Sequence, residues 1–411
     1  MEKLTPSDVS KDLVGRELTL YGVVLHIRDL GAKKFIILTD GGSTIQVVYE
    51  GDEKIRRGDS IKVRGILCED PRAPNGIELR AEELEFLSKT VEEIFDQWTL
   101  RKMSKDKKIK YRQLVLRLPE YFKIFEVYAN VAQLFREYFI KKKYLEVFTP
   151  KIVIMGTESG SEVFSILYFD KEAYLAQSPQ LYKQMILASG VKGVFEIASY
   201  YRSEVSFTPR HITEFRSVDA EINYVEDYNE VMDVLEEAIK YVLKHFNVKI
   251  DQIPRITFEE AQRIIKEKNP GAYRWDDIST EGEKILGEYA KEEYNSDFIF
   301  VTEYPSYSRA FYYMRFDEDP KRTKSFDLIF RGLEIVSGGQ REHRYEKVVS
   351  QLREKGINPE RLKYYLEAFK YGIPPHGGFG LGLDRFVKQL LNLEDIRECV
   401  LWPRDPDTLV P

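Results

Sequence analysis

Cysteine is scarce in this chain of 411 residues, where Cys68 and Cys399 are the only two. They have no metal-ligand spacing, so neither a disulfide framework nor a cysteine zinc site is expected, and a reducing cytoplasm fits best. The five histidines form no HxxxH pair and no Cys/His cluster, which argues against bound zinc. No apolar run approaches the roughly 18 residues of a membrane span, and MEKLTPSDVSKDL lacks the apolar core of a signal peptide. We therefore expect neither secretion nor membrane contact.

Positive charge is not in excess either, because 62 Lys and Arg face 68 Asp and Glu, a formal net charge of -6. This balance argues against nonspecific DNA binding but leaves room for a local basic face. The apolar content is ample, with 43% hydrophobic and 13% aromatic residues. A chain of this length exceeds one ordinary core, so we expect two or three domains.

The N-terminal part reads as short strands separated by turns. The strand-like segments are 17–27, 33–40, 43–50, 59–67 and 76–87. Five strands in about 70 residues predict a small closed barrel, most simply an OB-fold. Phe35 and Gln46 would lie on consecutive strands and could present a ring and an amide to an unstacked base. A barrel without a ligand is the alternative.

The segment that follows the barrel is basic, since RKMSKDKKIKYR (101–112) has seven basic residues and one acidic residue. A solvated linker and a contact with phosphates are both compatible with it. From residue 120 the pattern predicts a long amphipathic helix, followed by a strand that ends near Pro150. A second amphipathic helix is predicted over 226–246.

The remaining strand-like runs mostly follow one another without an intervening helix. They are AYLAQS, GVFEIASYYRSE, EFRSVDAEINYV, FIFVTEY, SFDLIFRGLEIVSG and CVLWP. This order predicts an antiparallel sheet flanked by helices, an α+β fold, and not a doubly wound parallel sheet. The predicted domains are the barrel (1–90), a basic linker or hinge (91–119) and a larger α+β domain (120–411).

Three polar clusters fall on strands that should be largely buried. The first, 200–222, reads as strand, polar loop and strand, with Arg202 before the loop and Phe215 and Asp219 after it. Arg202, Arg210, His211 and Phe215 lie within 14 residues and suit a nucleotide, with guanidiniums on phosphates and a ring on the base. A ladder of cross-strand ion pairs is the alternative reading.

The second cluster is SFDLIFRGLEIVSGGQREH (325–343), in which Asp327 and Glu334 are carboxylates on an otherwise buried strand. Ser337 follows three residues after Glu334, and Arg341 follows a Gly-Gly pair. Hard oxygen ligands at this spacing suit Mg²⁺ held against phosphates.

The third cluster is PPHGGFGLGLDRFVKQLL (374–391), whose glycines do not form the GxGxxG pattern of a dinucleotide loop. Alternate glycines in a strand indicate the close approach of a flat ligand or of another backbone. Arg385 would begin the next helix, where the helix dipole disfavours a cation, which suggests an anionic partner. A glycine-rich turn with a surface arginine is the alternative.

A lysine in QSPQLYKQ (177–184) stands at the start of an apolar segment. Lys183 could lie along the surface with its ammonium group in water, or it could pair with an anionic ligand.

Together these motifs resemble those of the class II aminoacyl-tRNA synthetases, in particular the archaeal-type aspartyl members of the aspartyl/asparaginyl subgroup. YYRSE and RHITEF resemble motif 2, GFGLGLDR resembles motif 3, and EVFTPK resembles motif 1, which places Pro150 at a dimer interface. VVLHIRDLGAKKFIILTD is similar to the anticodon-binding OB domain. The resemblance covers nearly the whole chain.

The resemblance implies a role for each matching residue. Arg202, Glu204 and Arg385 would be catalytic. ATP would be bound by Arg202, Glu204, Arg210, His211, Phe215, Glu334, Gly382 and Arg385. L-Aspartate would be bound by Glu158, Gln180, Lys183, Arg202, Asp219, Ser337 and Arg341. Mg²⁺ would be held by Glu334, Ser337 and Asp327, and the anticodon by Arg28, Phe35 and Gln46.

The resemblance also implies the choice of amino acid. In the aspartyl branch, the residues matching Lys183 and Arg341 hold the side-chain carboxylate of the substrate, and asparagine would leave a buried cation unpaired. We therefore expect a cytoplasmic, homodimeric aspartate–tRNA ligase for tRNA(Asp). The rivals are an asparaginyl-tRNA synthetase, a paralogue that forms asparagine without tRNA, and an OB-fold nucleic-acid-binding protein with an inactive core.

Four positions depart from the pattern of the subgroup. Val23 stands where tryptophan is common, Thr39 where arginine is common, and Lys143 where glycine is usual. Glu342 gives QREH where the aspartyl branch more often has QRIH. Because Val23 and Thr39 fall in or near the anticodon reader, charging of tRNA(Asn) as well as tRNA(Asp) stays open.

Overall fold

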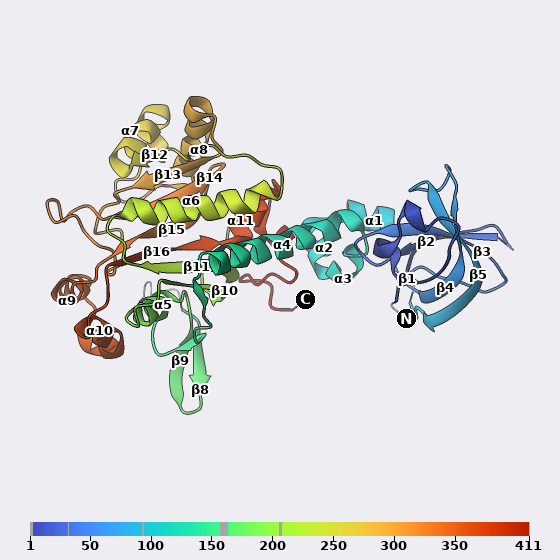
Figure 1. The fold of residues 1–411 in the computed structure, drawn as a ribbon, viewed down its shortest axis with the longest axis horizontal. Coiled ribbons are helices and arrows are strands. Elements are labelled where there is room, and N and C mark those ends of the chain that lie inside the picture. The colour runs from blue at the N-terminus through green and yellow to red at the C-terminus, as the bar shows by residue number, and fades with distance from the viewer. Residues whose placement is uncertain (1–2, 32, 93, 157–162, 205–207, 411) are drawn as a thin grey trace. The chain divides into compact units, whose positions relative to one another are not determined.

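The computed structural model describes residues 3–31, 33–92, 94–156, 163–204 and 208–410. The chain forms two compact units, Met1–Val127 and Tyr128–Val410 (Figure 1). The short helices after the barrel belong to the first unit. The predicted domain boundaries at residues 90 and 119 stay a prediction.

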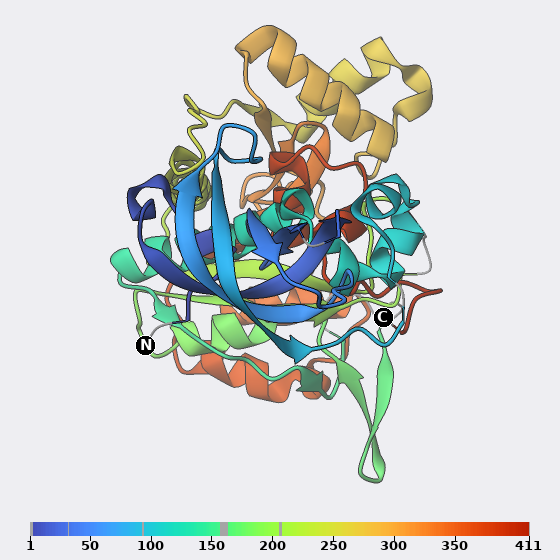
Figure 2. The same cartoon turned by 90° about the vertical axis from the view of Figure 1, so that its right-hand side faces the viewer.

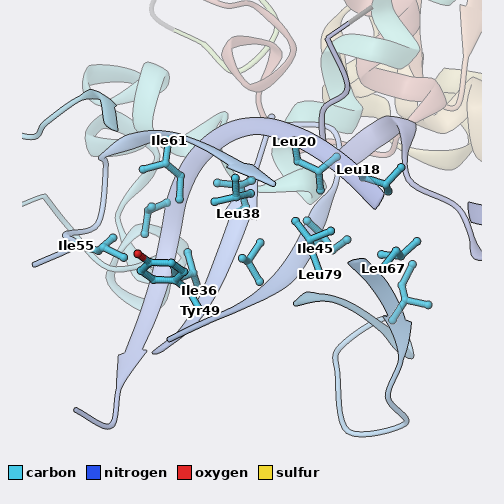
Figure 3. Packing of buried hydrophobic residues seen from close by; sticks show 14 residues of the cluster. Leu18, Leu20, Ile36, Leu38, Ile45, Tyr49, Ile55, Ile61, Leu67 and Leu79 are labelled. Carbon is cyan, nitrogen blue, oxygen red and sulfur yellow. The ribbon is translucent and has the colours of Figure 1, made fainter. Parts of the chain in front are cut away.

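The first unit contains the predicted five-stranded barrel (Figure 2). The barrel closes in the order β1-β2-β3-β5-β4. Its strands are β1 (Glu17–Asp29), β2 (Lys33–Thr39), β3 (Thr44–Glu50), β4 (Ser60–Glu69) and β5 (Ile77–Ser88). Alternate side chains of these strands point inward, and Leu20, Ile36 and Leu38 are fully buried (Figure 3). The alternation closes the barrel because each strand offers one apolar face to the same core.

The basic segment after the barrel is helical and not an extended linker. It contains α1 (Gln97–Lys102), α2 (Lys105–Lys110) and α3 (Arg112–Val115). Asp96 and Ser104 cap the first two helices by accepting backbone N–H groups. Leu100 and Val115 pack with Leu25 of β1, so a second apolar cluster holds these helices to the barrel.

The second unit is built on a sheet in the order β12-β13-β14-β15-β16-β11-β10-β6. The strands are β6 (Leu145–Glu146), β10 (Gly193–Tyr201), β11 (Glu214–Asn223), β12 (Arg255–Thr257), β13 (Phe298–Thr302), β14 (Ser325–Phe330), β15 (Leu333–Arg341) and β16 (His376–Gly382). The strands from β13 to β10 pair antiparallel. At the two edges of the sheet, β12 pairs parallel with β13 and β6 pairs parallel with β10. The predicted α+β fold is confirmed.

Helices and a small ribbon surround this sheet. The helices are α4 (Pro119–Lys141), α5 (Gln180–Leu187), α6 (Tyr228–Lys244), α7 (Phe258–Lys268), α8 (Thr280–Tyr294), α9 (Tyr345–Glu354), α10 (Lys363–Lys370) and α11 (Leu383–Leu390). The ribbon consists of β7 (Ile152–Val153), β8 (Ser165–Tyr168) and β9 (Lys171–Leu175). Short 3₁₀ turns cover Pro6–Asp8, Lys11–Leu13, Pro270–Ala272, Pro359–Leu362 and Ile396–Cys399.

The long helices α4 and α6 cover one face of the sheet. Phe139 of α4 stacks on Phe195 of β10 with ring centroids 5.1 Å apart. A Cβ atom on Gly377 of β16 would come within 2.6 Å of Val231 of α6, so glycine permits this close packing. The other face carries Asp219 and Ser337, and α7 and α8 pack against its β12–β14 end.

Two predicted strands are wrong. The run SFDLIFRGLEIVSG is a hairpin, because Arg331 and Gly332 turn the chain with φ angles of 47° and 75° between β14 and β15. This places Asp327 and Glu334 on neighbouring antiparallel strands. CVLWP is not a strand, because the 3₁₀ turn Ile396–Cys399 runs into it. Short apolar runs do not distinguish these conformations by periodicity.

The unusual lysine at position 143 ends helix α4 in the left-handed conformation, with φ 63°. Tyr144 N–H donates to Phe139 C=O and Lys143 N–H donates to Ile140 C=O, the hydrogen bonds of a Schellman motif. Glycine adopts this left-handed conformation without the steric penalty that a lysine side chain brings.

None of the helices in the described ranges is long and apolar enough to cross a membrane.

Candidate active site

A cleft with a volume of about 310 Å³ opens on the face of the large sheet that carries Asp219 and Ser337. The predicted residues that line it are Gln180, Arg202, Glu204, Arg210, His211, Phe215, Asp219, Glu334, Ser337, Arg341, Gly382 and Arg385. Lys183 and Asp327 lie behind its wall, and Glu158 falls outside the described residues. Residues from three distant sequence clusters therefore meet in one place.

One end of the cleft is strongly cationic. The pKa of His211 reflects this charge. Burial is the largest cause that lowers the pKa, the charges of Arg385, Arg210 and Arg202 add to the effect, and the pKa falls to about 4. Its Nδ1 lies 2.6 Å from Thr208 Oγ1, and its Nε2 lies 3.5 Å from Glu204 Oε2. A neutral histidine within reach of three guanidiniums indicates a binding position for a polyanion.

Arg202 and Arg210, between β10 and β11, are held by different parts of the second unit. Arg202 N–H donates to Thr213 C=O at 2.9 Å, and the guanidinium lies 5.3 Å from the ring centroid of Phe215. Arg210 donates to Glu283 of α8 at 2.6 Å. Among the described atoms, the Nε groups of Arg202 and Arg210 are buried without a hydrogen-bond partner. Both guanidiniums thus keep donating capacity for a ligand.

The third arginine, Arg385, is the third residue of α11, as predicted, and burial lowers its pKa. Its Nη1 donates to the backbone carbonyl of Glu334 at 3.0 Å. The neighbouring Asp384 accepts from Tyr128 OH at 2.7 Å and from Arg216 N–H at 2.6 Å. These two bonds tie the first turn of α11 to α4 and β11, so they orient Arg385.

The other end of the cleft contains a buried network of charges. Lys183 Nζ lies 3.0 Å from Asp219 Oδ1, 3.1 Å from Glu221 Oε2 and 3.0 Å from the Phe379 carbonyl. Arg341 Nε donates to Glu221 Oε1 at 2.8 Å. Burial would raise the pKa of Glu221, but Arg341 and Lys183 outweigh burial and lower it. Two cations and two carboxylates therefore balance one another at this end of the cleft.

Two hydrogen-bond donors of this network are available to bind a ligand. Arg341 Nη2 lies 3.3 Å from Gln180 Oε1, so the two side chains are neighbours, and both line the cleft. Within the described part of the chain, Arg341 Nη1 and Gln180 Nε2 are buried and have no hydrogen-bond partner. A guanidinium N–H and an amide N–H side by side suit a carboxylate.

The candidate metal ligands lie between these two ends. The Glu334 side chain is half-buried in the cleft wall, and desolvation together with the charge of Asp327 raises its pKa to about 7. Ser337 Oγ lies 3.4 Å from Glu334 Oε1 and donates to Asp327 Oδ1 at 2.7 Å. Asp327 also accepts from Arg309 at 2.5 Å.

A divalent cation fits these side chains. A desolvated carboxylate whose pKa is raised by a second carboxylate is relieved by a cation, and the hydroxyl of Ser337 adds a second oxygen ligand. In the described residues no group of three or more His, Cys, Asp or Glu side chains could hold a metal by itself. Such an ion would therefore depend on oxygens of a bound phosphate as well.

Sequence reasoning gave no role to three residues of this site. Glu221 lies two residues after Asp219 on the same face of β11, and this alternation of carboxylates in an apolar strand was a usable signal. Asp384 is part of GLDR, but its partners Tyr128 and Arg216 are distant in the sequence. Arg309 packs on Tyr304, with its Cζ 3.7 Å from the ring centroid, and no sequence pattern indicates this.

The predicted anticodon residues share the outer surface of the barrel. Arg28 lies opposite Phe35 in the β1–β2 pair, and Gln46 lies opposite Ile37 in the β2–β3 pair. Gln46 Nε2 donates to Glu78 at 2.9 Å, so its amide is engaged from one side. Phe35 is half-buried and Arg28 is exposed.

Two of the departures from the subgroup pattern have structural roles. Thr39 is buried, and its hydroxyl donates to the carbonyls of Ser43 and Arg117, so it is not on the reading surface. The Glu342 carboxylate is buried against Arg344, with Oε1 2.8 Å from its Nε, and does not line the cleft.

A five-stranded barrel joined to an antiparallel sheet with an arginine-lined cleft defines a class II aminoacyl-tRNA synthetase with an anticodon-binding domain. Family models agree: "tRNA synthetases class II (D, K and N)" matches residues 104–406, and "OB-fold nucleic acid binding domain" matches residues 18–87. The chain belongs to the class II tRNA synthetases of the D, K and N group, and it is a ligase.

Individual relatives cover nearly the whole chain. An aspartate–tRNA(Asp/Asn) ligase of Aeropyrum pernix is 42% identical, over 98% of this chain and 97% of that protein. An aspartate–tRNA(Asp) ligase of Pyrococcus furiosus is 39% identical, over 98% of both. Among solved structures, asparaginyl-tRNA synthetase of Pyrococcus horikoshii with asparaginyl-adenylate aligns over 100% of both chains, with a TM-score of 0.90 and 30% identity.

Proposed function

We propose that this protein is an aspartate–tRNA ligase, which activates L-aspartate with ATP and transfers it to tRNA(Asp). The observation that carries the choice of aspartate is the pair of open donors, Arg341 Nη1 and Gln180 Nε2, in the wall of the cleft. A side-chain carboxylate satisfies both donors, whereas an amide presents its NH₂ group to one of them. A buried donor left without an acceptor costs about 1–3 kcal/mol, and more where the donor is charged, as it is in Arg341.

In the first step the α-carboxylate of aspartate attacks the α-phosphorus of ATP, and pyrophosphate leaves. Arg202 holds the α-phosphate and the attacking carboxylate, while Phe215 stacks on adenine. Arg210, His211 and Arg385 bind the departing phosphates, with Glu204 positioned beside His211. Charge develops on phosphate oxygens, so positioning and cationic stabilisation supply the catalysis without a side-chain base.

The amino-acid end orients the substrate for this attack. Asp219 accepts the α-ammonium group, and Arg341 and Gln180 hold the side-chain carboxylate. Lys183, expected to bind that carboxylate, is engaged by Asp219 and Glu221, and we propose that it acts there by holding both carboxylates in place. In the second step a hydroxyl of the terminal adenosine of tRNA attacks the aspartyl carbonyl, and AMP leaves.

Glu334 and Ser337 would hold the divalent cation, with Asp327 behind them, and Mg²⁺ is the ion we propose. When bound, this ion neutralises phosphate charge. Glu334 is set for this role by its desolvation, and Ser337 is oriented by its hydrogen bond to Asp327.

We also propose a homodimer through the surface around Pro150. Phe148 and Ile154 expose 85% and 81% of their surface on either side of this exposed proline. Apolar side chains this exposed are expected to be covered by a partner. Light scattering at micromolar concentration should give twice the chain mass, and Phe148→Asp should give the monomer.

The test of the proposed function is ATP–pyrophosphate exchange without tRNA, comparing aspartate with asparagine. We expect exchange with aspartate alone. Exchange with asparagine alone would show that the donor pair was misread and that the protein is an asparaginyl enzyme. Charging of tRNA(Asp) and tRNA(Asn) transcripts then decides tRNA range, and asparagine formed from aspartate, ATP and ammonia without charging would identify the tRNA-independent paralogue.

A further inference from the structure

One arginine of the cleft wall takes no part in the proposed steps. Arg309 lies between β13 and β14 and lines the cleft, yet its side chain is only 12% exposed. Its Cζ lies 3.7 Å from the ring centroid of Tyr304, which is itself buried. The Tyr304 carbonyl accepts the N–H and the hydroxyl of Thr323, at 2.9 and 2.8 Å. The ring on which Arg309 stacks is thus tied to the residues that lead into β14.

Arg309 holds a carboxylate of β14. Its Nη2 donates to Asp327 Oδ2 at 2.5 Å, and the Asp327 side chain is almost fully buried. The second oxygen, Asp327 Oδ1, accepts the hydroxyl of Ser337 at 2.7 Å. Asp327 therefore bridges a guanidinium and a hydroxyl, with one donor to each of its oxygens.

This bridge decides which way the Ser337 hydroxyl points. A hydroxyl has one proton to donate and two lone pairs. Ser337 Oγ lies 2.7 Å from Asp327 Oδ1 but 3.4 Å from Glu334 Oε1, so the proton is directed at Asp327. The lone pairs of Ser337 are then available to a cation held by Glu334. If Asp327 turned away, the proton would go to Glu334 instead, and Ser337 would be lost as a ligand.

We propose that Arg309 is a positioning residue for the divalent cation, which fixes Asp327 so that the Ser337 hydroxyl offers its lone pairs to the ion. This inference rests on the proposed function, because it takes Glu334 and Ser337 as ligands of that ion. Arg309 itself contacts neither the ion nor ATP. Residues that orient a metal ligand from behind typically contribute about 10–100-fold to the affinity for the metal.

The electrostatic effect of Arg309 has the opposite sign. A guanidinium near a dication repels it, so removing the positive charge alone would tighten the binding of Mg²⁺. Lysine keeps the charge but lacks the planar fork that bonds a carboxylate while it stacks on a ring. Arg309→Lys therefore isolates the positioning effect from the effect of charge.

The test is calorimetric binding of ATP to the full-length protein, without amino acid or tRNA, in EDTA and over a series of free Mg²⁺ concentrations. In Arg309→Lys, the Mg²⁺ concentration that gives half of the full increase in ATP affinity should rise by about 10–100-fold. ATP affinity in EDTA should equal that of the wild type, which also shows that the variant is folded. A fall in ATP affinity in EDTA would show that Arg309 binds phosphate itself, and would overturn the inference.

The matched control is Arg255→Lys. Arg255 donates to Asp233 at 2.5 Å, and its Cζ lies 5.6 Å from the ring centroid of Phe300. Like Arg309, it has a buried Nε without a hydrogen-bond partner among the described atoms. It does not line the cleft, so the Mg²⁺ dependence of this variant should be that of the wild type. Equal Mg²⁺ dependence in the two variants would overturn the inference.

A double variant tests the route through Ser337. Ser337→Ala should itself raise the Mg²⁺ requirement, and adding Arg309→Lys should raise it no further, because both changes act on one ligand. A further rise as large as that of Arg309→Lys alone would show that Arg309 does not act through Ser337. The assay contains no aspartate. Absence of pyrophosphate exchange together with Arg309-dependent Mg²⁺ binding would therefore refute the proposed function and leave this inference standing.

Discussion

Arg341 and Glu221, 120 positions apart in the sequence, form a fully buried ion pair with Arg341 Nε 2.8 Å from Glu221 Oε1. The pair turns the guanidinium so that Nη1 remains open toward the cleft. Glu221 does not line the cleft, but it orients the guanidinium that does.

Arg341→Gln should lower kcat/KM for aspartate in pyrophosphate exchange by at least about 10³-fold, because the substrate carboxylate loses its cation. ATP binding, measured by calorimetry, should change little, since Arg341 lies at the amino-acid end. A loss of less than tenfold for Arg341→Gln would remove Arg341 from substrate binding.

Lys183→Met should instead lower the free energy of unfolding by about 3–5 kcal/mol, because it leaves Asp219 and Glu221 short of a cation.

Glu334→Gln should raise the Mg²⁺ concentration needed for half-maximal exchange by about 10–100-fold. Losses of metal affinity of this size are typical when residues around a bound metal are mutated. Chelation by EDTA should abolish exchange in the wild type, and Mg²⁺ should restore it. The control is Glu283→Gln, whose carboxylate binds Arg210 and the backbone N–H of Glu334 and is not a proposed ligand. Equal Mg²⁺ dependence for Glu334→Gln and wild type would contradict the assignment.

Phe35→Ala should impair tRNA charging while leaving pyrophosphate exchange intact. A stacked base is worth about 1–3 kcal/mol, so kcat/KM for tRNA should fall by about 5–150-fold. The matched control is Tyr371→Ala, which removes an aromatic ring that is 81% exposed in the second unit and should change neither reaction. If exchange fell together with charging, Phe35 would be supporting the fold and not binding tRNA.

His376 should make stability depend on pH. Burial lowers its pKa to about 4, while Glu221 acts in the opposite direction and Arg341 and His343 add to the lowering. Its Nδ1 lies 2.8 Å from the Pro374 carbonyl and its Nε2 lies 2.9 Å from Gln184 Nε2, so the neutral ring donates through Nδ1 and accepts at Nε2.

Because the folded pKa lies below the unfolded value of about 6.5, the stabilisation is complete above pH 6.5 and is lost as pH falls toward 4. The loss should reach about 3 kcal/mol. His376→Gln should therefore be less stable than wild type at pH 7, and this gap should narrow at pH 4.5 in urea unfolding. Other titrating groups are common to both proteins and cancel. A gap independent of pH would show that His376 is not neutral in the folded state.

Lys143→Gly should stabilise the protein, by up to about 1 kcal/mol. Glycine relieves the left-handed penalty of about 1–2 kcal/mol, offset in part by the greater freedom of the unfolded chain. The urea midpoint should rise without a change in slope. Asn392→Gly is the control, because Asn392 has φ 53° but asparagine tolerates this region, so a smaller gain is expected there. An equal gain at both positions would refute the argument.

Much of the fold and site could be predicted from the sequence because the signals were local. Alternating apolar residues are enough to define the barrel strands, and the motif residues Arg202, Phe215 and Arg385 need only their neighbours in the chain to be recognised. The two errors of secondary structure fell where local signals are ambiguous. The Arg331–Gly332 turn is brief, and CVLWP is apolar enough to pass for a strand.

The sequence by itself determined the class of enzyme, the cationic end of the cleft and the anticodon barrel, because each depends on residue types at short spacing. Only the tertiary structure decided that Lys183 is held by Asp219 and Glu221 and that Arg341 keeps one open donor. The physical reason is that burial and pairing of a charge depend on side chains brought together from strands far apart in the sequence. The sequence shows that a lysine is present, but the side chains packed around it decide with which anion it pairs.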